Sequence, residues 1–361
     1  MNLKKILFIC FFVIFVLLNV LFTQNVKLGQ KVGLYQGKKE KHIVLNRFDE
    51  FKIDPGEAIF KEISKVILHD GLIYILDSKQ SKIFVFDSSA ALISTIGQPG
   101  QGPGDLEYSR DFFIDSEGTI YVINSAAQRI EVFSPEGNFK KRIDFAVPKD
   151  IFYSRPSDIL MNQDHRIFIA YNISTNLIDE YQDTGSFVRT LIKRDNPVKV
   201  PGVNIGNSSS ICLLKQSQDI IHFNYFTGIF KILSQSGIIK EKFSAYDSLH
   251  KDQMSKILSD IKKSDKPFLS IEVFELWSSS FCVNNEGMIL SMLWLKKKKE
   301  PQKFFIFSID GTYLYQMAIP FFEDDNVDQM YFYDNTYIFI TMSQKIFFSK
   351  CQKNKKCCPF S

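Results

Sequence analysis

The feature that most constrains the fold is an internal repeat in residues 63–145. Asp70-Gly71 recurs as Glu117-Gly118, and Ile73-Tyr74 recurs as Ile120-Tyr121, in each case 47 residues later. Each copy contains four short apolar runs that are separated by polar or Gly-containing turns. A repeat of about 45 residues with four short strands in each unit is typical of a β-propeller.

The repeat continues in weaker form to the end of the chain. Further units cover about 157–192, 209–243, 279–319 and 327–350. The turn before the fourth run carries Gly137, Gly185, Gly237 and Gly311 in units two to five. Glycine supplies a positive φ there at no steric cost, and unit one has Ala90 instead, so we expect its turn to be built differently. The pattern predicts an all-β fold, a six-bladed β-propeller.

The sixth unit has only three runs, which would leave one sheet edge open. An open edge is an aggregation hazard. Residues 42–53 read as a lone strand ahead of the first unit. We predict that this strand docks as the outer strand of the last blade and closes the ring.

The ends of the chain read differently from the repeats. Lys4 and Lys5 precede an uncharged apolar run over residues 6–22, which predicts a signal peptide or an N-terminal membrane anchor in residues 1–24. The body would then be exported, to the periplasm or cell surface, with the anchored form held in the inner membrane. Residues 25–41 read as a linker, 42–350 as the propeller, and 351–361 as a Cys- and Lys-rich tail.

One insertion interrupts the repeats at 244–278. Its apolar residues recur at helical spacing, which predicts a helix there; they are Met254, Ile257, Leu258 and Ile261.

The six cysteines form no evident disulfide framework, and pairing among Cys351, Cys357 and Cys358 stays open. A net charge of +4 over 361 residues does not indicate a nucleic-acid-binding protein. Contact with a membrane is expected only through residues 6–22.

Residues 96–139 contain a Gly-rich joint followed by the motif D-x-x-G-x-I-Y-V. This stretch resembles the NHL-repeat propellers, and the arrangement is similar to exported bacterial six-bladed propellers of unassigned function. The resemblance implies the fold, but such propellers include lyases, hydrolases and binding modules. NHL-type amidating lyases hold zinc with several channel-facing His residues. His69, His165 and His222 do not share one layer of the repeat here, so we do not expect a three-His zinc site.

A set of polar residues marks the start of the first run in each unit. Counting back from the turns gives Ser64, Asp111, Asp158, Ser210, Ser280 and Asp328. The first strand of every blade lines the central channel, so these six would form a ligand-binding ring at one channel mouth. The carboxylates of Asp111, Asp158 and Asp328 could hold Ca²⁺, which prefers oxygen ligands. Alternatively, each side chain bonds neighbouring backbone N–H groups, or Asp111 pairs with Arg110.

These observations leave two functions open. The first is a non-catalytic binding or scaffold module whose face loops and channel mouth contact a protein, peptide or glycan. The second is a metal-dependent lyase or hydrolase with its site in the channel.

Overall fold

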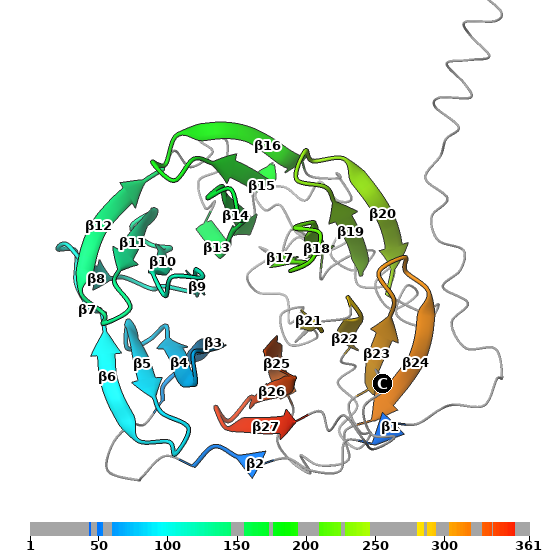
Figure 1. Ribbon diagram of the computed structural model, residues 1–361, viewed down its shortest axis with the longest axis horizontal. Coiled ribbons are helices and arrows are strands. Elements are labelled where there is room, and N and C mark those ends of the chain that lie inside the picture. Colours follow the sequence, from blue (N-terminus) through cyan, green and yellow to red (C-terminus); the bar gives the residue numbers. More distant parts are fainter. Residues whose placement is uncertain are drawn as a thin grey trace, which may run out of the picture.

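Six small sheets are arranged around a central axis in the computed structural model (Figure 1). The structure describes residues 43–44, 49–52, 60–145, 155–172, 176–193, 209–224, 228–245, 280–284, 287–293, 303–318, 327–333 and 335–350. The predicted six-bladed propeller is confirmed. In every blade the first strand lies nearest the axis and the last lies at the perimeter (Figure 1).

The first three blades are consecutive four-stranded antiparallel sheets. Blade 1 contains β3 (Ile63–His69), β4 (Leu72–Asp77), β5 (Lys82–Phe86) and β6 (Leu92–Ile96). The short pair β7 (Gln98–Pro99) and β8 (Asp105–Leu106) follows it. Blade 2 contains β9 (Asp111–Ile114), β10 (Ile120–Asn124), β11 (Arg129–Phe133) and β12 (Phe139–Asp144). Blade 3 contains β13 (Arg155–Met161), β14 (Ile167–Asn172), β15 (Asn176–Tyr181) and β16 (Phe187–Lys193).

The last three blades complete the ring. Blade 4 contains β17 (Ser209–Leu213), β18 (Ile220–Asn224), β19 (Ile229–Leu233) and β20 (Ile239–Ser244). Blade 5 contains β21 (Phe281–Val283), β22 (Ile289–Leu293), β23 (Lys303–Phe307) and β24 (Tyr313–Ala318). Blade 6 contributes β25 (Val327–Tyr333), β26 (Thr336–Thr341) and β27 (Ile346–Lys350).

The N-terminal segment closes the ring, as the sequence predicted. Strand β2 (Asp49–Glu50) pairs antiparallel with β27 and becomes the fourth strand of blade 6. The ring of Phe51 then packs edge-on against Phe86 of blade 1 and Phe348 of blade 6, with centroids 5.4 and 5.6 Å apart. Part of the predicted strand at 42–53 lies elsewhere: the short strand β1 (Ile43–Val44) adds in parallel to β24 as a fifth strand of blade 5 and not to blade 6.

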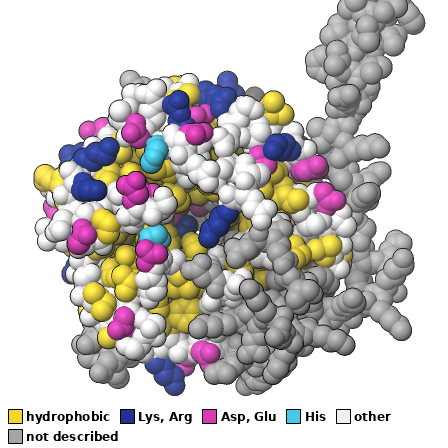
Figure 2. All heavy atoms as spheres, viewed as in Figure 1, with side chains coloured by type: hydrophobic (Ala, Val, Ile, Leu, Met, Phe, Trp, Pro, Cys, Tyr) yellow, Lys and Arg dark blue, Asp and Glu magenta, His cyan; other side chains and the backbone are white. Residues whose placement is uncertain are grey.

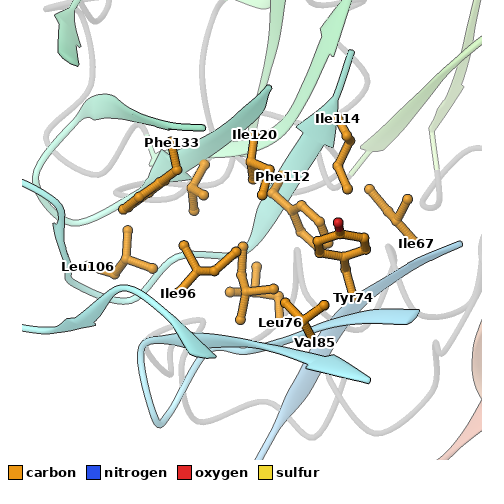
Figure 3. Close-up of a cluster of buried hydrophobic side chains, with 12 residues drawn as sticks. Ile67, Tyr74, Leu76, Val85, Ile96, Leu106, Phe112, Ile114, Ile120 and Phe133 are labelled. Atoms are coloured by element: carbon orange, nitrogen blue, oxygen red, sulfur yellow. The ribbon is translucent and has the colours of Figure 1, made fainter. Parts of the chain in front are cut away.

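The hydrophobic core lies between the blades, because each sheet buries both of its faces against its two neighbours. Blades 1 and 2 meet in one such cluster, where Tyr74, Leu76 and Val85 of blade 1 face Phe112 and Ile120 of blade 2 (Figure 3). The other blade interfaces hold comparable clusters of buried aliphatic and aromatic side chains. This packing fixes the first strands side by side around the axis.

The hairpin turns behave as the glycine pattern indicated, with one correction. Gly137, Gly185, Gly237 and Gly311 all have positive φ in the turn before the fourth strand. Ala90 has a φ of 68° and makes the same turn hydrogen bond, to Asp87 O, that Gly137 makes to Ser134 O. The expectation of a differently built turn was therefore wrong. The Asp87 carboxylate accepts hydrogen bonds from the N–H groups of Ser89 and Ala91, which stabilises this turn without glycine.

Several sequence predictions lie outside the described residues. They are the apolar segment in 1–24, the linker at 25–41, nearly all of the helical insertion at 244–278, and the tail at 351–361. Within the part of the chain that the structure describes, no helix is long and apolar enough to cross a membrane.

Candidate functional site

The candidate site is the inner wall of the ring, where the first strands carry polar side chains. The pairing of first and second strands identifies one equivalent position in each blade. We call the six residues at this position the channel ring: Lys65, Asp111, Asp158, Ser210, Ser280 and Gln329. Five of them pair with second-strand residues, in the order Leu76, Ile123, Ala170, Phe223 and Ile340, and Ser280 is placed by its neighbour Phe281, which pairs with Ser291.

Four members of the channel ring were predicted from the sequence, and two predictions were displaced by one residue. Ser64 and Asp328 lie at irregularities of the ladder, where the register shifts between Ile63 and Lys65 and between Val327 and Gln329. Lys65 and Gln329 therefore take the positions that Ser64 and Asp328 were expected to fill.

The length of the first hairpin explains the displacement in blade 1. Leu68 pairs with Ile73 there, whereas Ile114 pairs with Ile120 in blade 2. The connection in blade 1 is one residue shorter. The 47-residue offset therefore holds for the second strands but becomes 46 for the first strands.

Several channel-ring side chains bond the backbone of the next blade. Asp111 Oδ2 accepts a hydrogen bond from Ile159 N at 2.9 Å, and Ser280 Oγ accepts one from Met330 N at 3.0 Å. The Gln329 side-chain amide donates to Ile63 O at 3.2 Å. Asp111 and Ser280 therefore bond backbone N–H groups, as the alternative considered from the sequence had it, although the groups belong to the next blade. The three side chains join blade 2 to blade 3, blade 5 to blade 6, and blade 6 to blade 1.

Lys65 is the cation that pairs with Asp111. Its Nζ lies 2.8 Å from Asp111 Oδ1, and the side chains are 17% and 5% exposed. Burial opposes the positive charge, but Asp111 and the neighbouring tyrosines outweigh it, so the pKa of Lys65 is raised above its ordinary value. Arg110, the partner considered from the sequence, instead lies over the ring of Tyr108. Both oxygens of Asp111 are therefore engaged by donors of the protein.

Asp158 differs from Asp111 in being partly exposed, and among the described residues the ion pair of Lys65 is with Asp111. Burial, followed by the charge of Asp111, raises the pKa of Asp158 to about 7. Lys65 and hydrogen bonds from Ser157 and Ser210 act in the opposite direction and are outweighed. A carboxyl group with such a pKa is both protonated and ionised in appreciable amounts at neutral pH.

Aromatic and thiol groups complete this part of the wall, and the sequence analysis did not single them out. Lys65 Nζ lies 5.4 Å from the ring centroid of Tyr331, whose hydroxyl donates to Ser64 O at 3.0 Å. Burial raises the pKa of Tyr333 to about 12 and that of the Cys212 thiol to about 11. Tyr331, Tyr333 and Cys212 are all partly exposed. A correct strand register would have indicated them, because Tyr331 and Tyr333 follow Gln329 by two and four residues and Cys212 follows Ser210 by two.

The described histidines do not gather at the channel. His69 and His165 lie at turns between first and second strands, and His222 is buried in β18. Among the residues described, no group of three His, Cys, Asp or Glu side chains is placed to hold a metal ion. A cation near Asp111 would have to displace Lys65.

The wall therefore combines one ammonium, two carboxyl groups and two tyrosines from four blades. Figure 2 shows a hollow near the centre of one face of the ring, with basic side chains beside it. These groups are the polar side chains that the described inner wall offers to a molecule entering the channel.

Residues 55–253, more than half of the chain, match the model of a family described as 6-bladed beta-propeller (DUF5128). The chain belongs to this family. A comparison with curated proteins gave no match.

Solved structures share the fold of this six-bladed propeller. A Bacteroides fragilis protein described as exported is 17% identical, with a TM-score of 0.58 and coverage of 81% of this chain and 83% of its own. A DUF4221 family member from Bacteroides vulgatus is 13% identical, with a TM-score of 0.58 and coverage of 84% and 96%. An inactive variant of Staphylococcus aureus virginiamycin B lyase, crystallised with quinupristin, is 13% identical, with a TM-score of 0.52 and coverage of 82% and 83%. At these identities the similarity shows the fold alone.

Proposed function

We propose that this propeller is an exported, non-catalytic binding protein that takes a ligand at the channel mouth. The observation that carries the proposal is that some polar residues of the inner wall bond neighbouring blades together while others remain partly exposed. Asp111, Ser280 and Gln329 are engaged in bonds that join the blades, while Asp158, Tyr331 and Tyr333 stay partly exposed. A fixed wall with a few convergent polar groups is the usual form of a ligand site.

Export is part of this proposal. Support comes from the basic residues and apolar run at the N-terminus of the sequence, and from a fold neighbour that is described as exported. Partners such as a protein, peptide or glycan would approach the same face through its loops.

One observation favours a second candidate, a lyase or hydrolase. Asp158, with a pKa of about 7, could act as a general acid or base at neutral pH. A metal-dependent version is less well supported, because both oxygens of Asp111 already have protein partners.

The two functions can be separated on the purified full-length chain. We expect no stoichiometric Ca²⁺ or Zn²⁺ by elemental analysis and no turnover of ester, lactone or amidated glycine substrates. Turnover that is lost in Asp158→Asn but kept in Asp164→Asn, an exposed acid of the same blade, would replace the binding proposal with the enzymatic one.

A further inference from the structure

The outer edges of the blades are protected against pairing with other chains, except in blade 1. An unpaired outer strand can bind a strand of another molecule, and proteins prevent this with charged side chains or by covering the edge. In blade 6 the outer strand is covered by β2, and in blade 5 it is covered by β1. Blade edges of this chain therefore accept an added strand in both the antiparallel and the parallel orientation.

The uncovered outer strands of blades 2, 3 and 4 carry charged residues instead. In these blades and in blade 1, the pairing of the third and fourth strands shifts register at the last residue of the third strand. The fourth-strand residue that pairs just before this shift is therefore an equivalent position in all four blades. It is Lys141, Arg189 and Glu241 in blades 2, 3 and 4, and Ser94 in blade 1.

Strand β6 has neither form of protection within the part of the chain that the structure describes. None of its five residues is charged, and no described strand adds outside it. It lies at the perimeter of the ring (Figure 1). Ile93 is 57% exposed, and Thr95, two residues on and therefore on the same face of the strand, is exposed as well. The edge of blade 1 thus presents an uncharged, β-branched surface to solvent.

We infer that β6 is the pairing site for a second copy of this chain, whose own β6 adds antiparallel about a two-fold axis at Ser94. This axis places Ser94 opposite itself and Ile93 opposite Thr95 of the other copy, so each contact is made twice. Cross-strand pairs of this kind stabilise a sheet, whereas like charges directly opposite each other destabilise it.

The same symmetry disfavours the other uncovered edges. In blades 2, 3 and 4 it would set Lys141, Arg189 or Glu241 against its own copy. Blade 1 is therefore the edge suited to a two-fold dimer. This inference goes beyond the proposed function and does not depend on it, since β6 lies at the perimeter and the proposed ligand site lies in the channel.

Sedimentation velocity of the full-length chain over a series of concentrations tests the pairing. We expect a reversible rise of the weight-average mass toward twice that of the monomer. Ile93→Lys should abolish this rise, because it puts a charge into the pairing edge. Phe187→Lys, at an exposed side chain of β16, should leave the rise unchanged.

Cysteine cross-linking tests the position of the axis. Residues directly opposite in an antiparallel pair have Cα atoms about 4.5–5.5 Å apart, which a disulfide can span. Mild oxidation of Ser94→Cys should therefore give a covalent dimer on a non-reducing gel. The wild type and Lys141→Cys, at the equivalent position of blade 2, should give far less of it.

Three results would overturn the inference: a monomer at every concentration, a dimer that persists in Ile93→Lys, or equal cross-linking of Ser94→Cys and Lys141→Cys. A monomeric chain would mean that this edge pairs with a different protein or with none. The Ser94→Cys substitution is small, so cross-linking stays decisive even if Ile93→Lys does not fold. The outcome is independent of the turnover and metal measurements that test the proposed function.

Discussion

At the scale of single residues, Lys65 and Asp111 form the most consequential contact of the channel wall. The pair is largely buried, and the Asp111 carboxylate also accepts a hydrogen bond from the backbone N–H of Ile159. The pair therefore serves both the charge balance of the channel and the junction of blades 2 and 3. Removing one partner of a buried ion pair leaves the other charge uncompensated, which costs more than removing both.

We expect Lys65→Met to lower the free energy of unfolding by about 3 kcal/mol. The double variant Lys65→Met with Asp111→Asn should recover more than half of this loss, because no unpaired charge remains. Urea denaturation of the wild type and of these variants measures both values. Equal stability of the single and double variants would show that the ion pair is not the source of the effect.

At the scale of secondary-structure elements, the sequence predicted strand order and turn positions better than register. The repeat gave the first strands and four of the six channel-ring positions. It misplaced Ser64 and Asp328 because the ladder shifts register at both, and because the first hairpin of blade 1 is one residue shorter than that of blade 2. Such local irregularities leave little trace in a hydrophobic pattern. For the same reason, Lys65 was not recognised as the partner of Asp111.

The turns offer a direct test of backbone strain. Ala90 adopts a φ of 68°, a conformation that costs a non-glycine residue about 1 kcal/mol. Ala90→Gly should therefore stabilise the chain by about 0.5–1 kcal/mol. Gly185→Ala at the equivalent turn should destabilise it by about 3 kcal/mol, since an added Cβ would lie 2.1 Å from Asp144 O. Thermal denaturation of both variants checks these signs, and a destabilised Ala90→Gly would contradict the account of this turn.

At the scale of the whole molecule, the closure of the ring was predictable because the sixth unit lacks a strand and the N-terminal segment supplies one. The pairing of β2 with β27 confirms that reasoning. The added strand β1 was not predictable, because two residues carry too little pattern to identify a partner strand. The role of Phe51 was also not evident from the sequence, since it depends on contacts with both blades that flank the closure.

Phe51 provides a test of how much the closure contributes. Phe51→Ala should lower the free energy of unfolding by about 3 kcal/mol, because the side chain packs against both ends of the ring. The matched variant Phe187→Ala, at a side chain that is 52% exposed on β16, should cost less than about 1 kcal/mol. Similar losses in the two variants would contradict a special role for the closure.

The binding proposal rests on the raised pKa of Asp158, and the pH dependence of stability tests this pKa most directly. The folded-state pKa of about 7 lies above the ordinary value of 3.8, so between these values the folded chain binds more protons than the unfolded chain. The stability that Asp158 contributes is complete below about pH 4 and is lost as the pH rises through 7. Asparagine does not titrate and should not show this loss.

The decisive measurement is therefore the difference in free energy of unfolding between Asp158→Asn and the wild type from pH 5 to pH 8. We predict that the variant gains stability relative to the wild type as the pH rises, with the change levelling off above pH 7. A difference that stays constant over this range, or that turns against the variant at high pH, would show that Asp158 is an ordinary compensated carboxylate and would remove the basis for a ligand site at the channel mouth.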